Sequence, residues 1–253
     1  MNQPIGYIVI PDVHGHYDTL VAMLELLEKR NLLSNRKLVF LGDYVDRGPK
    51  IPDTLSLCVE LKKSGHIFLM GNHDYWLVEI FQQKMEGKKS LRWAYKYGVP
   101  ILQQYFHFLS RRLPRNRDEL YYDTCEKIRQ IIPPQHREFI ESCQMYFETE
   151  TMLCIHAGIN YEEDWEKQKQ TLDQHDLKID PMPMQIKSHE FALSEYNPFS
   201  NKVIITGHYP MDENDIIRRN RVRLCGGIEY DELARLHAWV SDTGELLTIH
   251  RTA

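Results

Sequence analysis

The sequence predicts an α/β fold, and three observations indicate it. Near the N-terminus, short apolar segments alternate with amphipathic ones, in the β-α-β-α-β order of a layered domain with right-handed crossovers. Apolar strand patterns return at 152–155 and 203–206, beyond a stretch rich in helix-forming residues. The chain has 253 residues, 42% of them hydrophobic and 26% charged, which is the composition of a folded globular protein.

The N-terminal elements follow from their apolar periodicity. The β-branched run at 8–10 predicts a buried strand. Leu20, Met23, Leu24 and Leu27 recur at the spacing of one helix face and predict the helix that follows. The next elements are a strand, a helix and a strand at 38–41, 54–61 and 67–70.

The character of the chain changes at about residue 75. The stretch 75–148 is rich in aromatic, charged and helix-forming residues, and it predicts several helices inserted into the α/β body. Beyond the strands at 152–155 and 203–206, the segment 221–250 predicts antiparallel strands, with a hairpin turn at 242–244. We therefore expect a single domain, residues 1–253, with a helical cap at about 75–148.

Composition and charge exclude several classes of protein. With 31 Lys and Arg against 36 Asp and Glu, the net charge of −5 gives no global basic field, so a nucleic-acid duplex is not expected as a partner. The five cysteines are scattered and form no C-x-x-C pair, which favours reduced thiols in a cytoplasmic protein. The sequence shows neither a signal-peptide pattern nor a membrane-spanning apolar run, so no membrane association is expected.

Each of the five apolar strands is followed at once by a polar motif rich in potential ligands. The motifs are Asp12-Val13-His14-Gly15, Gly42-Asp43-Tyr44-Val45-Asp46-Arg47-Gly48, Gly71-Asn72-His73-Asp74, His156-Ala157-Gly158 and Gly207-His208-Tyr209. Functional groups of α/β sheets gather beyond the carboxyl ends of the strands, so these motifs are expected to meet. Their glycines would let backbone pack closely beneath the site or adopt positive φ.

The ligand types select the metal. Asp, Asn and His without cysteine suit manganese, iron, zinc or magnesium and disfavour an iron–sulfur or structural zinc site. About six ligands exceed what one ion needs, so two ions are predicted, as in the clamp used for displacement at phosphorus. Asp43 is the central candidate for a bridging carboxylate.

Together these motifs resemble the metallophosphoesterase (calcineurin-like) superfamily, and Gly42 to Gly48 resembles its phosphoprotein phosphatase branch. That branch includes Ser/Thr phosphatases and symmetrical dinucleoside tetraphosphatases. The resemblance covers 8–70 and about 153–250, but not the helical insertion. It implies a β-sandwich of two sheets with flanking helices, and two divalent ions, expected to be Mn²⁺ with Fe or Zn as alternatives.

The resemblance also implies a role for each motif residue. Asp12 and His14 would hold the first metal, Asp43 would bridge both, and Asn72, His156 and His208 would hold the second. A hydroxide between the metals would attack phosphorus. His73 would be the general acid, Asp46 would pair with His73 and favour its protonated form, and Arg47 would bind phosphate oxygens, with Asn72 also at the substrate.

Two departures from the family pattern stand out. Pro11 occupies a position where the family usually has glycine, with no loss of metal expected. No arginine lies between Arg137 and Arg218, so the second phosphate-binding arginine of many members is missing, is supplied by the inserted segment, or is replaced by a lysine such as Lys167, Lys169 or Lys187.

Two basic runs lie outside the motifs. The run Arg111 to Arg117 is expected to be a solvated loop, with a landing patch for an acidic substrate as the alternative. For the second run, strand alternation predicts that Arg219, Arg221 and Arg223 share one exposed face.

The sequence thus predicts a metal-dependent hydrolase of phosphomonoesters, including phosphoserine and phosphothreonine. The expected substrate is a phosphoprotein or a small phosphate ester. One alternative is a symmetrical dinucleoside polyphosphate hydrolase. The other is a catalytically inactive scaffold, which the intact ligand set argues against.

Overall fold

The computed structural model describes residues 6–84, 87–109, 124–174, 197–212, 216–230 and 234–252. A five-stranded sheet carries the N-terminal half, in the order β10-β9-β1-β2-β3. Its strands are β1 (Gly6–Ile10), β2 (Arg36–Phe40), β3 (Ile67–Phe68), β9 (Arg235–Val240) and β10 (Leu246–His250). β1, β2 and β3 are parallel and are joined by α1 (Tyr17–Lys29) and α2 (Ile51–Lys63), which confirms the β-α-β-α-β prediction.

A second five-stranded sheet has the order β4-β5-β6-β8-β7. Its strands are β4 (Tyr146–Glu148), β5 (Met152–Ile155), β6 (Val203–Thr206), β7 (Ile217–Arg218) and β8 (Arg221–Arg223). β5, β6 and β8 are parallel, and α9 (Trp165–Asp173) lies between β5 and β6 in the chain. β4 lies inside the stretch predicted to be helical, because its residues pair with β5 at the edge of this sheet.

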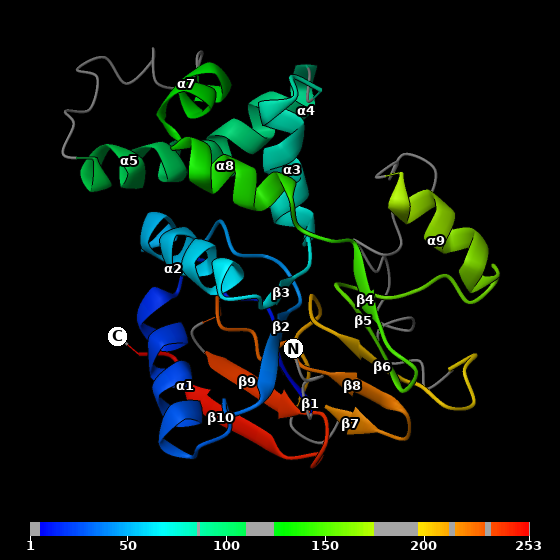
Figure 1. The fold of residues 1–253 in the computed structure, drawn as a ribbon. Coiled ribbons are helices and arrows are strands. Elements are labelled where there is room, and N and C mark those ends of the chain that lie inside the picture. The colour runs from blue at the N-terminus through cyan, green and yellow to red at the C-terminus, as the bar shows by residue number, and fades with distance from the viewer. Residues whose placement is uncertain are drawn as a thin grey trace.

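The two sheets pack face to face and form the sandwich that the resemblance implied (Figure 1). Val9 and Val39 of the first sheet share one buried cluster with Cys154, Ile205 and Val222 of the second. Neighbouring residues of the same strands point outward into a larger cluster that includes side chains of α1, α2 and α9. Burial on both faces explains why these strands read as continuous apolar runs.

The helices that lie between β3 and β4 in the chain stack over α2 (Figure 1). They are α3 (Asn72–Phe81), α4 (Gly87–Trp93), the π-helix η1 (Ala94–Gly98), α5 (Val99–Phe108), α7 (Thr124–Ile131) and α8 (Pro134–Glu141). Buried His136 of α8 contacts two other helices: its Nδ1 lies 2.7 Å from the Tyr105 hydroxyl of α5, and its Nε2 lies 3.0 Å from Ser56 Oγ of α2. This polar contact links α8 and α5 to α2.

Two predictions about the C-terminal region are wrong. β8 is not part of an antiparallel C-terminal unit but pairs in parallel with β6 in the other sheet, whereas β9 and β10 do form the predicted hairpin. Arg221 and Arg223 are buried rather than exposed. Arg221 donates to the Tyr161 hydroxyl at 2.7 Å, and its guanidinium carbon lies 5.7 Å from the centre of the Tyr161 ring.

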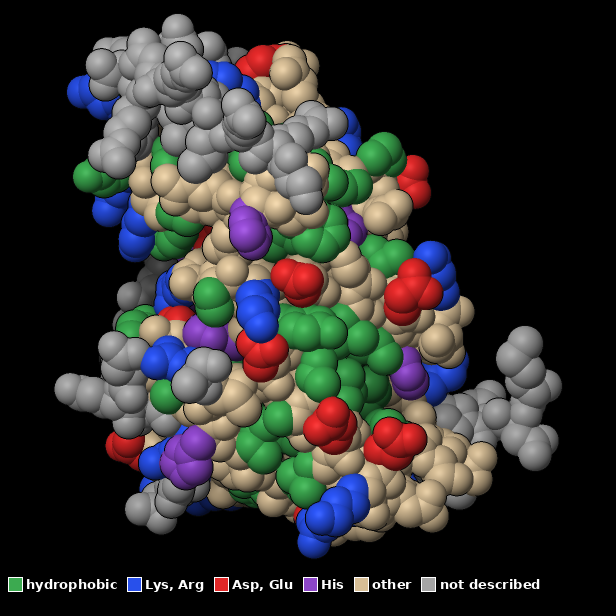
Figure 2. Space-filling model, turned by 90° about the vertical axis from the view of Figure 1, so that its left-hand side faces the viewer, with side chains coloured by type: hydrophobic (Ala, Val, Ile, Leu, Met, Phe, Trp, Pro, Cys, Tyr) green, Lys and Arg blue, Asp and Glu red, His purple; other side chains and the backbone are tan. Residues whose placement is uncertain are grey.

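Other surface and thiol predictions have mixed outcomes. The cysteines are free thiols, four of them buried and Cys125 half-buried. Acidic and basic side chains are interspersed on the face shown in Figure 2. The basic run Arg111 to Arg117 and Lys187 lie outside the described residues. No helix among those described is both long and apolar enough to span a membrane.

Candidate functional site

The polar motifs meet where the parallel strands of both sheets end. Asp12 and His14 follow β1, Asp43 follows β2, and His156 and His208 follow β5 and β6. Asn72 and His73 begin α3, just beyond β3. All of these side chains are buried except that of His208, which is half-buried. The motifs therefore meet at one edge of the sheets, as the sequence predicted.

Two groups of side chains within this site have the spacing needed to hold a metal ion, and they share Asp43. One group is His14, Asp43 and His73, and the other is Asp43, His156 and His208. Within each group the ligand atoms lie within 4.8 Å of one another. A single carboxylate common to two clusters is the arrangement that a pair of bridged ions requires.

The histidine tautomers fit a cation at this position. The Nδ1–H groups of His14 and His156 donate to the backbone carbonyls of Val45 and Leu41, at 2.8 and 2.9 Å. Their Nε2 atoms therefore carry lone pairs, and these lie 3.5 and 3.6 Å from the same oxygen, Oδ2 of Asp43. Lone pairs and a carboxylate that face one another repel unless a cation lies between them.

The burial of these ligand side chains also favours the binding of a cation. Burial raises the pKa of Asp43 well above its usual value, and the nearby charge of Asp12 raises it further. Burial lowers the pKa of His14, and it lowers that of His208 to about 3. The site thus favours neutral imidazoles and leaves the carboxylate without a counter-charge, which suits a divalent metal.

Asn72 and Asp12 occupy different places in the site. Asn72 Oδ1 lies 3.0 Å from His156 Nε2, so it sits beside the second group, as the resemblance implied. Both carboxylate oxygens of Asp12 accept from the backbone N–H of His208, at 3.0 and 2.8 Å. In the described residues the first ligand group thus contains His73, where the resemblance implied Asp12.

His73 lies between Asp46 and Arg47. Its Nδ1 is 2.6 Å from Asp46 Oδ2, and its Nε2 faces Nη2 of Arg47 at 3.3 Å. The predicted pairing of Asp46 with His73 is therefore present. Burial, together with the charges of His14 and Arg47, lowers the pKa of His73 well below its usual value, and a protonated His73 held by Asp46 stays a prediction.

Two carboxylates of the site were assigned no role from the sequence, although Asp74 lies within one of the motifs. Asp74 accepts from the backbone N–H groups of Asp43, Tyr44 and Gly71, at 2.7, 3.0 and 2.9 Å, and so fixes the loop that carries Asp43. Glu229 forms an ion pair with Arg47. A signal for Glu229 was present, because it follows Gly226 and Gly227 after a buried strand, as the recognised motifs do.

The backbone beneath the site is strained at several non-glycine residues. His14, Asp43, Asp46, Arg47 and His208 have φ of 45°, 54°, 69°, 67° and 63°. Such conformations cost about 1–3 kcal/mol each and cluster at functional sites. Glycine permits the close approach of the loops: a Cβ on Gly71 would lie 2.1 Å from Asp43 Oδ1.

Aromatic side chains form one wall of the site. The ring centres of Trp76 and Tyr97 lie 4.6 and 5.0 Å from that of His73. Tyr97 belongs to η1, so a helix of the inserted segment contacts the motif residues directly. Trp93 and Tyr105 of the same segment are buried in the core cluster, and Tyr97 belongs to that cluster while also contacting the site.

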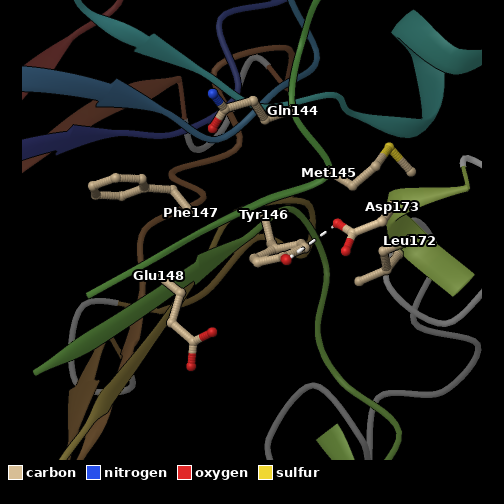
Figure 3. A pocket seen from close by; sticks show the side chains of 7 residues that line it. All are labelled: Gln144, Met145, Tyr146, Phe147, Glu148, Leu172 and Asp173. Atoms are coloured by element: carbon tan, nitrogen blue, oxygen red, sulfur yellow. Dashed lines mark hydrogen bonds between the residues drawn. The ribbon is translucent and has the colours of Figure 1, made fainter. Parts of the chain in front are cut away.

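The lysines suggested as replacements for the missing arginine are engaged elsewhere. Lys167 pairs with Glu163, and Lys169 pairs with Glu148 and Glu166 on and around α9. A separate hollow at the edge strand β4 and α9 is lined by none of the motif residues (Figure 3). Its lining residues are Gln144, Met145, Tyr146, Phe147, Glu148, Leu172 and Asp173.

Comparison with known proteins places the chain in a family. Residues 7–238 match the family model described as calcineurin-like phosphoesterase. Over 83 residues, 32% of this chain and 29% of the relative, the sequence is 42% identical to a symmetrical bis(5'-nucleosyl)-tetraphosphatase of Psychromonas ingrahamii. It is 34% identical over 103 residues to a catalytic protein of protein phosphatase 2A from Dictyostelium discoideum, covering 39% of this chain and 30% of that one.

The alignments thus span less than a third of these relatives' lengths. A solved structure assigned as a diadenosine tetraphosphatase superposes over 98% of this chain and 96% of its own, with a TM-score of 0.61 and 15% identity. At that identity the likeness shows the fold alone. The family match covers nearly the whole chain and includes the five motifs. This chain therefore belongs to the calcineurin-like phosphoesterase family.

Proposed function

We propose that the protein is a binuclear metal-dependent phosphatase that hydrolyses phosphomonoesters, including phosphoserine and phosphothreonine. The observation that carries the proposal is the shared Asp43, whose Oδ2 faces the lone pairs of His14 and His156. Two divalent ions at Asp12, His14, Asp43, Asn72, His156 and His208 would supply an activated water and neutralise phosphate charge. Ligands of oxygen and imidazole type suit Mn²⁺, with Fe or Zn as alternatives.

The protein's own residues would bind the substrate and move a proton. The Arg47 side chain is 29% exposed, lies beside His73 and offers planar N–H donors that match phosphate oxygens. His73 would donate a proton from Nε2 to the leaving oxygen, while Asp46 holds its Nδ1 at 2.6 Å and fixes the ring orientation. Because Arg47 Nη2 faces this same Nε2, substrate phosphate would have to draw Arg47 away before His73 can act.

A metal-dependence assay tests the proposal. The purified protein, stripped of metal and reloaded with Mn²⁺, should release phosphate from an aryl phosphate, and chelation should abolish the release. Elemental analysis should find two ions per chain in the wild type. Asp43→Asn should lower both occupancies together, because a neutral amide bridges poorly, whereas exposed Asp18→Asn should change neither. At most one ion per loaded chain would contradict the binuclear site.

A second candidate function is hydrolysis of dinucleoside polyphosphates. The wall formed by Trp76 and Tyr97 beside His73 favours it, because aromatic rings can stack on a nucleobase. The tetraphosphatase relative points the same way. Formation of nucleoside diphosphate from diadenosine tetraphosphate, compared with phosphate release from phosphopeptides, separates the two substrates. Binding of partners without hydrolysis in either assay would instead fit an inactive scaffold.

The remaining proposals concern architecture and location. We propose a single domain with a helical cap at about 75–148, and the contact between Tyr97 of η1 and His73 supports a role for this cap in substrate choice. The free cysteines support a reducing compartment such as the cytoplasm.

A further inference from the structure

Glu229 places a second negative charge on the phosphate-binding side of the site. Its side chain is 5% exposed and forms an ion pair with Nη1 of Arg47, from the loop that follows β8. The other carboxylate oxygen, Oε2, is buried and has no hydrogen-bond partner in the described part of the chain. The ion pair with Arg47 is therefore the main side-chain contact of this carboxylate among the described residues.

Arg47 lies between Glu229 and the candidate metal-ligand groups. Its Nη2 lies 3.3 Å from His73 Nε2, and its charge lowers the pKa of both His14 and His208. The Tyr230 hydroxyl lies 3.4 Å from the same Nη1 that binds Glu229. The guanidinium thus spans the gap between the metal-ligand groups and Glu229, where a phosphate bound to the metals would meet it.

Glu229 and a phosphate group would bind the same guanidinium. Glu229 occupies Nη1, so phosphate would meet the remaining N–H donors of Arg47 with a carboxylate nearby that repels it. The ion pair with Glu229 also cancels the charge of Arg47, so the site is less positive than its motif residues alone indicate. Glu229 should weaken the binding of inorganic phosphate most, because this compact dianion has the largest charge for its size.

We propose that Glu229 is a specificity-determining residue that competes with phosphate for Arg47 and so weakens the binding of free phosphate and of small phosphate dianions. This inference rests on the proposed function, because it assumes that phosphate binds at the metal ligands beside Arg47. Weak binding of free phosphate would favour release of this product. It would also make the affinity for a substrate depend on the part of the molecule beyond its phosphate group.

Phosphate binding measured by calorimetry tests the inference without relying on turnover. Mn²⁺-loaded wild type, Glu229→Gln and Glu229→Asp would each be titrated with inorganic phosphate. Glu229→Gln keeps the shape but removes the charge, and it should lower the Kd for phosphate by roughly tenfold, as expected for one like charge nearby. Glu229→Asp keeps the charge and should stay close to the wild type. Glu60→Gln removes an equal charge from the exposed face of α2 and should leave the Kd unchanged.

The same variants in an Arg47→Ala background complete the design. Without Arg47, Glu229→Gln should still tighten phosphate binding, but by clearly less, because only the direct repulsion is left. A Kd that is unchanged or raised in Glu229→Gln overturns the inference, and a raised Kd would show that Glu229 supports Arg47 instead. If Glu229→Gln leaves the Kd for phosphate unchanged or raises it, but the wild type still hydrolyses aryl phosphates, only the inference fails. If the wild type neither binds phosphate nor hydrolyses any ester, the proposed function itself fails.

Discussion

His73 is the residue whose chemistry can be isolated most cleanly. With Nδ1 held by Asp46, its Nε2 is the atom free to serve a leaving oxygen once Arg47 is drawn away. His73→Ala should therefore slow esters with poor leaving groups, such as phosphoserine, by about 10²–10⁴-fold. Activated aryl esters need no proton and should lose far less. Steady-state rates on a leaving-group series measure this, and equal losses throughout would indicate that His73 instead supports the metals, as its place in a ligand group allows.

Arg47 carries a second prediction at this scale. Two of the three lysines suggested as alternatives are held by glutamates around α9, which leaves Arg47 as the described cation that faces His73. A bidentate charge-assisted contact is worth about 3 kcal/mol, so Arg47→Ala should lower kcat/KM by roughly 10²-fold. Arg47→Lys should recover part of the loss. A single Ala substitution at Lys167 or Lys169 with an equal effect would contradict this assignment.

Most motif residues could be predicted from the sequence, because each follows an apolar strand directly and needs no knowledge of distant contacts. Glu229 and Asp74 could not be assigned in the same way. Their roles depend on which loop lies opposite: Asp74 on the Asp43 loop, and Glu229 on Arg47. The sequence marks both positions, Asp74 by its motif and Glu229 by the glycines before it, but it does not show which residue each carboxylate holds.

Among the helices, His136 of α8 fixes the inserted segment to α2. Ser56 Oγ donates to the Pro52 carbonyl, so it accepts from His136 Nε2–H, and His136 Nδ1 accepts from the Tyr105 hydroxyl. This network requires a neutral imidazole, and burial lowers the pKa of His136 to about 4. The unfolded chain takes up the proton near pH 6.5, so the folded state loses stability as the pH falls from about 6.5 to 4.

Replacement of this histidine should flatten that dependence. His136→Gln cannot titrate, so its melting temperature should fall less than that of the wild type between pH 7 and pH 5. Exposed His250→Gln is the matched control and should follow the wild type. Melting curves in chelator keep the metal site out of the comparison. Parallel pH profiles for wild type and His136→Gln would show that His136 does not contribute.

Strands were predicted where burial on both faces produced apolar runs and also at β8, but the sheet that β8 joins was predicted wrongly. In Arg221-Val222-Arg223, charged and apolar residues alternate as in a strand with one solvent-exposed face, yet both arginines are buried. Tyr161, from the loop after β5, lies against Arg221, and that contact joins segments far apart in the chain. Which sheet β8 enters is decided by such contacts, so local pattern could not assign it.

At the scale of the whole molecule, the sequence pattern predicted an α/β body, but only the resemblance implied two packed sheets. Both sheets contribute parallel strands whose ends meet, so ligands that are distant in sequence share one carboxylate. The candidate metal-ligand groups therefore join the two halves of the sandwich. His14 and Asp43 come from the first sheet, and His156 and His208 come from the second.

This arrangement predicts that metal binding stabilises the entire fold. Without a cation, buried Asp43 faces lone pairs of His14 and His156, and the loops beneath are held at unfavourable φ. A ligand that binds only the folded state adds about 2.7 kcal/mol at a hundredfold excess over its Kd. For a protein of this size that corresponds to a rise in melting temperature of roughly 5–10 °C.

Thermal melts with excess Mn²⁺ and with chelator would measure this rise. Asp43→Asn should lose most of it, because the bridge that couples the two sheets is weakened, while Asp18→Asn should keep it. His208→Ala removes a ligand of one group only, and it should reduce the rise without abolishing it. A wild-type melting temperature that does not respond to Mn²⁺, Fe²⁺ or Zn²⁺ would contradict the coupling, because a site formed by both sheets cannot bind an ion tightly and leave their association unchanged.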